Sequence, residues 1–262
     1  MPDLQVHLEL HGDVGRLHWD GHPEPAVLTR AVSLCADDAI LGQGARRVEA
    51  EVQAGDWPGR RALQRAGFRR EGIRRQALQV GDSYVDTLLY ARLATDPVHG
   101  PMGFSGVMNS VLATKRVISH VVFTDEQSRV LLLETTYKKD FELPGGVVEP
   151  AESPRRGAIR EVAEEIGLVL NLAGPALVDW MPPSLGWSDA LEFLFDAGVL
   201  DEQAVSLMRL DPGEIRAAHW LAADQLEGTV SELSSRRIRA VLAARVPGRR
   251  APAVFTEDGR AY

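Results

Sequence analysis

The sequence predicts an α/β (α+β) protein made of two domains. Segments with the two-residue period of strands are interleaved with segments of helical period on both sides of residues 98–109. That stretch is rich in glycine and proline and has neither period, so we expect a linker there. The expected first domain is residues 1–97 and the second is residues 110–246. A loosely held tail is expected over residues 247–262.

The composition limits the classes of function. The 262 residues fit one large or two small domains, and 45% hydrophobic with 25% charged residues is typical of soluble globular proteins. The net charge of −8 argues against a general nucleic-acid binder, which needs a basic surface. The N-terminal segment has no basic stretch followed by a long apolar run, so we expect neither a signal peptide nor a membrane partner. Cys35 is the only cysteine, which excludes an internal disulfide and fits a reducing cytoplasm.

The expected first domain alternates helices and strands. Residues Val27–Ile40 have a helical pattern, and residues 46–52 alternate as a strand. A second helix is expected over Trp57–Ala66, ended by Gly67. Two strands joined near Gly81 follow.

The expected second domain has its own strands and helices. Its predicted elements are strands at 117–123, 129–136, 191–200 and 217–222, and a helix at 231–245. A turn over residues 125–128 joins the first two strands.

The most informative helix is predicted at residues 154–166. Ser153 is a favourable N-cap, Pro154 suits the first helical position, and Gly167 supplies a C-terminal stop. The apolar residues recur at i, i+3, i+4 and i+7, namely Ile159, Val162, Ala163 and Ile166. The sequence therefore predicts an amphipathic helix with one buried face.

Three glutamates lie beside that apolar face. Glu161, Glu164 and Glu165 are spaced i, i+3, i+4, where like charges repel, and Arg160 can pair with Glu164 four residues on. A solvated acidic face would normally mix lysines among its glutamates. Oxygen ligands without nearby cysteine or histidine suit Mg²⁺ or Mn²⁺ better than zinc. We therefore favour a site for a hard divalent cation.

Residues 146–168 carry these glutamates in a fixed pattern. The pattern is glycine, five residues, glutamate, seven residues, then Arg-Glu-aliphatic-any-Glu-Glu-any-Gly-aliphatic. It resembles the signature of the Nudix hydrolases, whose specified positions are all matched here. The preceding FELPGG, Phe141–Gly146, also resembles the segment before that signature. The resemblance implies an α/β/α sandwich with a mixed sheet, and an enzyme that cleaves a nucleoside diphosphate linked to another group by attack of water at phosphorus.

The resemblance also implies roles for particular residues. The metal ligands would be the Gly145 carbonyl and the carboxylates of Glu161, Glu164 and Glu165. The cation would be Mg²⁺, with Mn²⁺ as the other candidate. The catalytic set would be Glu152 as an outer ligand, Arg160 to orient the glutamates, and Glu161 and Glu165.

The general base is not fixed by the signature. Glu161 is the first candidate to accept a proton from water, and Glu214 is the second. The alternative for Glu214 is a solvated loop residue.

Four residues are candidates for contact with the substrate. Trp180 and Trp187 follow the signature and could stack on a nucleobase, although either could equally be a packing anchor. Lys139 and Phe141 precede it, and the lysine could meet phosphates or lie in a solvated turn.

The first domain resembles the C-terminal half of GNAT-type acetyltransferases over residues 24–97, most clearly in AGFRREG, Ala66–Gly72. That family cradles a pyrophosphate at a glycine-rich turn entering a helix. Here the matching stretch, Gly21–Ala31, has the acidic Glu24 and no glycine at that turn. We therefore expect no acetyl-coenzyme A site, and a degenerate module for dimerisation, substrate shaping or regulation.

Several alternatives stay open at this stage. Because a truncated sheet leaves an unpaired edge, we expect a homodimer through the first domain. A non-catalytic nucleotide sensor and a bifunctional acetyltransferase–hydrolase are the alternatives to a hydrolase. The seven histidines have no metal-ligand spacing and are expected to be structural or solvated. The substrate is open among nucleoside triphosphates, oxidised nucleotides, ADP-ribose, sugar nucleotides and dinucleotide polyphosphates.

Overall fold

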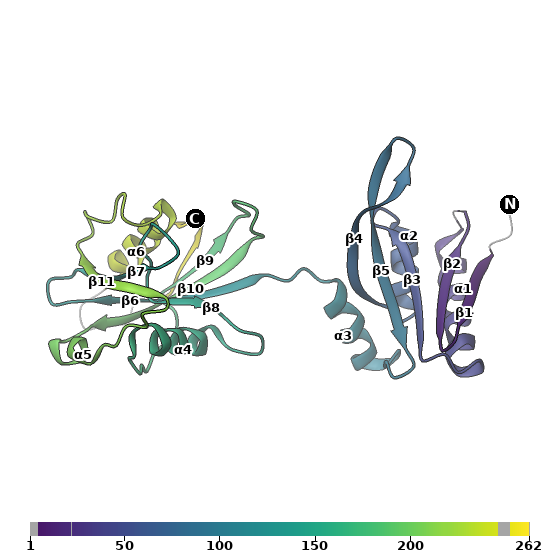
Figure 1. Ribbon diagram of the computed structural model, residues 1–262, viewed down its shortest axis with the longest axis horizontal. Helices are drawn as coiled ribbons and strands as arrows, with labels where there is room; N and C mark the ends of the chain where they lie inside the picture. Colours follow the sequence, from purple (N-terminus) through teal and green to yellow (C-terminus); the bar gives the residue numbers. More distant parts are fainter. Residues whose placement is uncertain (1–4, 22, 246–251, 262) are drawn as a thin grey trace. The chain divides into compact units, whose positions relative to one another are not determined.

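The computed structural model describes residues 5–21, 23–245 and 252–261. The chain divides into two compact units, Met1–Ala113 and Thr114–Tyr262 (Figure 1). Each unit is a mixed sheet with helices, so the predicted α/β class is confirmed. None of the helices described is long and apolar enough to cross a membrane.

The first unit is built around a mixed sheet in the order β1-β2-β3-β5-β4. Its elements are β1 (Val6–His11), β2 (Val14–Trp19), α1 (Pro25–Asp37), a π-helical turn (Asp38–Gly42), β3 (Arg47–Gln53), α2 (Trp57–Arg65), β4 (Arg69–Val80), β5 (Ser83–Leu93) and α3 (Gly100–Val111). Strands β2 and β3 are parallel, and the other neighbours are antiparallel. The helices and strands predicted between residues 27 and 93 are present. Strands β1 and β2 were not predicted.

The core of this unit lies on one face of the sheet. In β3, Val48, Ala50 and Val52 are buried and pack with α1 and α2 in a single hydrophobic cluster. Because side chains alternate along a strand, Glu49 and Glu51 lie on the opposite face. One face is thus apolar and covered by helices (Figure 1), and the other is charged.

The linker predicted at residues 98–109 is wrong, because most of that stretch is helix α3. This helix packs against β4, where the Ser110 hydroxyl accepts a 2.9 Å hydrogen bond from the Arg70 amide. Gly103 allows the segment before the helix to lie closely against it, since a Cβ there would lie 2.5 Å from the Val98 carbonyl carbon. The glycines that suggested a linker, such as Gly103, instead allow close packing of the helix.

The second unit contains a larger mixed sheet, ordered β11-β7-β6-β10-β9-β12-β13, with β8 paired to β6. Its elements are β6 (Arg116–Thr124), β7 (Val130–Thr135), β8 (Gly145–Val147), α4 (Pro154–Ile166), β9 (Leu177–Met181), β10 (Ala190–Val199), α5 (Glu202–Leu207), β11 (Ile215–Leu221), α6 (Glu232–Ala244), β12 (Val254–Glu257) and β13 (Arg260–Ala261). Strand pairs β6–β10 and β9–β12 are parallel.

Two separate cores make this unit a three-layer sandwich. Val121 and Phe123 of β6 face α4, which contributes Val162 and Ile166. Val122, between them in the strand, faces the opposite way and packs with α6. Figure 1 shows α4 and α6 on opposite sides of the sheet. This is the α/β/α arrangement that the sequence predicted.

The expectation of a loosely held C-terminal tail is wrong for residues 254–261. Strand β12 adds to the sheet beside β9, with Val254 opposite Leu177 and Thr256 opposite Asp179. Residues 247–251 and 262 of the expected tail lie outside the described residues, as does residue 246 at the end of the expected second domain. Strands β12 and β13 therefore belong to the same sheet as the strands that pack on α4.

Candidate active site

Helix α4 has the bounds that its sequence predicted. The Ser153 hydroxyl accepts from the Arg156 amide, and Gly167 ends the helix at a left-handed φ of 74°. Val162 and Ile166 are buried in the core as predicted, whereas Ala163 is exposed. The side chain of Glu165 is also buried, so the apolar face includes one carboxylate.

Strand β8 lies directly against two glutamates of α4, Glu161 and Glu165. The Gly145 amide donates a 2.8 Å hydrogen bond to Glu165 Oε2. Gly145 has a φ of 134°, and a Cβ there would lie 2.2 Å from the Ser119 carbonyl oxygen. A Cβ at Gly146 would lie 2.9 Å from Glu161 Oε1. Gly145 therefore permits close contact with the backbone of β6, and Gly146 leaves room for the Glu161 carboxylate.

Arg160 connects Glu161 to the two other glutamates, Glu152 and Glu164. Its guanidinium donates to both carboxylate oxygens of Glu152 at 3.1 Å, to Glu161 Oε1 at 2.9 Å and to Glu164 Oε2 at 3.0 Å. It also donates to the Val147 carbonyl of β8. Hydrogen bonding to Arg160 holds the pKa of Glu152 below its usual range. One arginine thus fixes three carboxylates and the adjacent strand.

Negative charge nevertheless exceeds positive charge at this site. Burial, helped by the nearby charges of Glu161 and Glu214, raises the pKa of Glu165 to about 7, although the Gly145 hydrogen bond and His120 act to lower it. Burial likewise raises the pKa of Glu161, with Glu164 and Glu214 adding to the effect. A cluster in which carboxylates resist ionisation is one that a divalent cation would stabilise.

The carboxylates of Glu161, Glu164 and Glu165 are oxygen donors that fit a hard cation. In this structure Glu161 and Glu164 pair with Arg160. Within the part of the chain that the structure describes, no group of three or more His, Cys, Asp or Glu side chains is arranged around a common metal position. Glu164 is 60% exposed at its side chain and lies in the ion pair with Arg160. Glu161, Glu165 and the Gly145 backbone are the donors that lie together.

The structure brings further residues to the cluster that the sequence did not single out. His120 of β6 is the register partner of Gly145, and its Nδ1 lies 3.0 Å from Glu192 Oε1. Tyr137 lies close enough that the charges of Glu142, Glu165 and Glu214 contribute, after burial, to raising the pKa of its hydroxyl. No local pattern marks these residues, because strand register and loop position bring them here.

The two candidate tryptophans lie at the β9–β10 hairpin. Trp180 belongs to β9, not to a loop, and its indole N–H donates to Asp189 at 3.3 Å. Trp187 is 63% exposed, and the guanidinium carbon of Arg116 lies 4.6 Å from its ring centroid. Both indole side chains are thus accessible to solvent.

The two candidates before the signature lie in a different place. Phe141 stacks on His219 with ring centroids 4.5 Å apart, and its amide donates to the Thr229 carbonyl. Lys139 and Phe141 line a cavity of about 320 Å³ together with Glu142 and Ser231. This cavity adjoins the chain segment that leads into Gly145.

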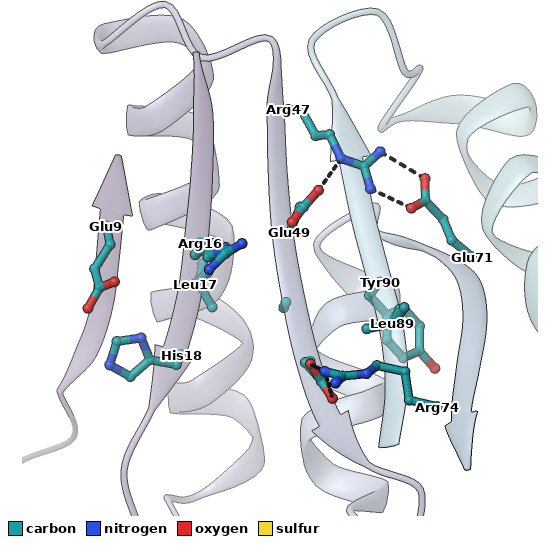
Figure 2. Close-up of a pocket in the computed structure, with 12 residues that line it drawn as sticks. Glu9, Arg16, Leu17, His18, Arg47, Glu49, Glu71, Arg74, Leu89 and Tyr90 are labelled. Carbon is teal, nitrogen blue, oxygen red and sulfur yellow. Dashed lines mark hydrogen bonds and ion pairs between the residues drawn. The ribbon is translucent and has the colours of Figure 1, made fainter. Parts of the chain in front are cut away.

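The first unit has a cavity of its own, of about 470 Å³, on the charged face of its sheet. Figure 2 shows Arg47 held between Glu49 and Glu71. Arg74 donates to Glu51. Arg47 and Arg74 thus join strands β3 and β4 by ion pairs that span the intervening β5.

The helix that would face a phosphate in the first unit is already capped. Glu24 Oε2 accepts from the amides of Ala26 and Val27 at 3.1 and 3.0 Å. A carboxylate of the chain therefore takes the amides that an anionic ligand would use at the start of α1.

Comparison with known proteins places the second unit. Residues 114–242 match the family model of the NUDIX domain. The chain is similar to the MutT protein from Methanosarcina mazei Go1, at 21% identity and a TM-score of 0.43, over 51% of this chain and 97% of that one. It is similar to a UDP-X diphosphatase at 19% identity and a TM-score of 0.44, over 56% of this chain and 70% of that one.

The N-terminal part has a different neighbour. An acetyltransferase of the GNAT family from Bacillus anthracis is similar at 21% identity and a TM-score of 0.31, over 35% of this chain and 57% of that one. None of the curated proteins matched the chain.

The glutamate helix, the glycine turn and the family match all fall within residues 114–242. Residues 114–242 are a NUDIX domain, so the second unit is a Nudix hydrolase domain.

Proposed function

We propose that this chain is a Mg²⁺-dependent pyrophosphohydrolase that cleaves a nucleoside diphosphate linked to another group. The observation that carries the proposal is Glu165, which is buried, hydrogen-bonded to Gly145, and close enough to Glu161 and Glu214 for its pKa to reach about 7. This arrangement costs stability in the absence of a cation. It is explained if the cluster exists to hold one.

The residues that would hold Mg²⁺ are Glu161, Glu164, Glu165 and the Gly145 carbonyl, with Mn²⁺ as an alternative ion. A bound divalent cation neutralises a pyrophosphate and lowers the pKa of water. Arg160 keeps the glutamates oriented through its hydrogen bonds to Glu152, Glu161 and Glu164.

The base that takes the proton from water is proposed to be Glu161, with Glu214 as the second candidate. Glu161 is half-buried with a raised pKa, which suits proton transfer near neutral pH. The Glu214 carboxylate acts on the same cluster, since its charge raises the pKa of both Glu161 and Glu165. Glu161→Gln should abolish more activity than Glu214→Gln, and the reverse order in kcat would exchange the roles.

The substrate contacts are proposed at Trp180, Trp187, Lys139 and Phe141. The two exposed tryptophans offer a stacking surface, and Lys139 lines a cavity next to the segment before Gly145. Activity against five substrate classes tests this proposal: nucleoside triphosphates, oxidised nucleotides, ADP-ribose, sugar nucleotides and dinucleotide polyphosphates. Release of phosphate or nucleoside monophosphate is measured with Mg²⁺, for the natural chain and for Glu165→Gln.

Turnover of one class that collapses in Glu165→Gln supports the proposal and names the substrate class. Glu51→Gln, a change in the first unit, is the matched control and should keep full turnover. Nucleotide binding without turnover by folded protein would instead identify a sensor.

The first unit is proposed to be a non-catalytic module that forms a homodimer, in a cytoplasmic protein. The Glu24 cap at α1 supports the absence of a pyrophosphate site, and the partly buried free thiol of Cys35 suits a reducing compartment. Calorimetry with acetyl-coenzyme A should give no heat of binding. Light scattering should give twice the chain mass of 28.7 kDa. Tight coenzyme binding or a monomer at micromolar concentration would refute these two proposals.

A further inference from the structure

A buried chain of charged side chains runs across the second unit, on the face of the sheet that packs against α6. His120 Nδ1 lies 3.0 Å from Glu192 Oε1. The other oxygen of Glu192 accepts from Arg237, which also donates to Asp179 Oδ2 at 2.8 and 2.6 Å. Asp179 Oδ1 then accepts from the Thr256 hydroxyl at 2.6 Å and from the Gly259 amide at 2.9 Å. The chain joins four strands, α6 and the C-terminal hairpin.

These groups are almost completely removed from water. Asp179 is 0% exposed, Arg237 3%, Glu192 4% and Thr256 2%. Burying charges costs several kcal/mol per ion, and apolar residues of similar volume are often at least as stabilising. The burial alone therefore gives no advantage in stability. A specific geometric role would explain why charged residues stand here.

The chain ends against the backbone of the candidate active site. His120 is the register partner of Gly145, and a Cβ on Gly145 would lie 3.0 Å from the ring atom Cδ2 of His120. The imidazole therefore packs on the backbone of Gly145. On its other side, the Gly145 amide donates to Glu165. Gly145 is held between a ring fixed by Glu192 and a carboxylate of α4.

Two features make the His120 ring a fixed support. Because Glu192 is a carboxylate, it accepts from Nδ1–H and so determines both the ring orientation and which nitrogen carries the proton. Glu192 itself cannot turn, since its second oxygen is held by Arg237, which Asp179 anchors in turn.

We propose that His120 and the Glu192–Arg237–Asp179 chain form a positioning device, which holds the Gly145 turn so that its amide meets Glu165 and its carbonyl is presented to the metal. The C-terminal hairpin completes the device through Thr256 and Gly259. The metal role of Gly145 rests on the proposed function, whereas the hold on the Gly145 amide does not. His120 and Glu192 act through Gly145 and Glu165 and are positioning residues.

The test compares two amide substitutions on the same strand. Glu192→Gln weakens the device while keeping the side-chain volume. Asp196→Asn is the matched control, because Asp196 of β10 also pairs with an arginine next to α6, Arg245, at 2.8 and 2.5 Å. Three readouts apply to the full chain: exchange of the Gly145 amide by NMR without metal, Mn²⁺ affinity by calorimetry, and kcat with the best substrate.

Glu192→Gln should speed exchange of the Gly145 amide and lower Mn²⁺ affinity and kcat about 10-fold each, as for other partners of metal-site ligands. Asp196→Asn should change each by less than about 2-fold, as expected of a partner remote from the metal ligands. His120→Ala should resemble Glu192→Gln, and His120→Asn, which can still donate to Glu192, should recover part of the loss. These two variants decide the matter if Glu192→Gln does not fold.

Variants of His120 and Glu192 that match Asp196→Asn in all three readouts would overturn the inference. Equal losses in Glu192→Gln and Asp196→Asn, in proportion to unfolded protein, would also overturn it by showing a purely structural role. Failure of the natural chain to bind Mn²⁺ or hydrolyse any substrate would refute the proposed function instead, while amide exchange at Gly145 would still test the positioning device.

Discussion

The two units each hold a cluster of glutamates and arginines, and the clusters differ in how their charges are matched. On the open face of the first unit, Arg47 pairs with Glu49 and Glu71, and Arg74 pairs with Glu51. Hydrogen bonding to Arg47 lowers the pKa of Glu71. These carboxylates are satisfied within the sheet, so this face is a stable surface as it stands.

The cluster of the Nudix unit lacks this balance. Arg160 serves three glutamates, and Glu165 and Glu214 lie outside its hydrogen bonds. Burial and like charges raise the pKa of Glu165 to about 7. The comparison teaches that the presence of glutamates does not by itself favour a cation site, whereas a buried carboxylate that has no arginine partner and a raised pKa does.

The largest expected effect is the loss of activity in Glu165→Gln. This change removes a proposed metal ligand but keeps the hydrogen bond from Gly145, so turnover should fall about 10³-fold while the fold is retained. Steady-state kinetics with the best substrate measure it. Turnover within 10-fold of the natural chain would remove Glu165 from the metal site.

Arg160→Ala should lower kcat by about 10- to 100-fold, because Glu152, Glu161 and Glu164 lose their common partner and repel one another. Arg47→Ala is the matched change in the first unit. It should lower stability by about 1 kcal/mol and leave kcat unchanged. Similar kinetic effects of both changes would mean that the two clusters do not differ as we infer.

The pH dependence of stability should separate the clusters without any substrate. The folded-state pKa of Glu165, about 7, lies above its ordinary value of 4.5, so its contribution is fully present below about pH 4.5. It is lost as the pH rises through 7, by about 3 kcal/mol at most. Glu71, with a lowered pKa, contributes in the opposite direction, since its stabilisation is lost as the pH falls.

Denaturant unfolding at pH 5 and pH 8 in a metal-free buffer measures the difference. Glu165→Gln should be more stable than the natural chain at pH 8 and show a smaller loss between the two pH values. Adding Mg²⁺ should remove most of that advantage. If the natural chain and Glu165→Gln lose the same free energy of unfolding between pH 5 and pH 8, the pKa of Glu165 is not raised.

The smallest effect is expected from Trp187→Ala at the exposed hairpin. Loss of a stacking surface should raise KM by about 3- to 10-fold with little change in kcat, because stacking on so exposed a ring should contribute about 1 kcal/mol, the low end of the range for base–aromatic stacking. Leu185→Ala, an exposed neighbour in the same turn, is the control. An unchanged KM would leave the pairing with Arg116 as the only role of Trp187.

The sequence by itself determined the parts of this protein that local physics controls. The cap at Ser153, the stop at Gly167 and the apolar period between them fixed α4 at Pro154–Ile166. Periodicity predicted most of the strands between residues 47 and 221 within a residue or two. Helix α3 was missed because its glycines serve packing and not chain flexibility.

Only the tertiary structure decided which distant residues meet. The register of β6 with β8 places His120 against Gly145, and the pairing of β12 with β9 brings Thr256 to Asp179. Neither contact has a local signature, because register depends on the whole sheet and its helices. Likewise, burial between the sheet and α4, and not the glutamate spacing, decides that Glu165 resists ionisation whereas Glu164 lies exposed beside Arg160.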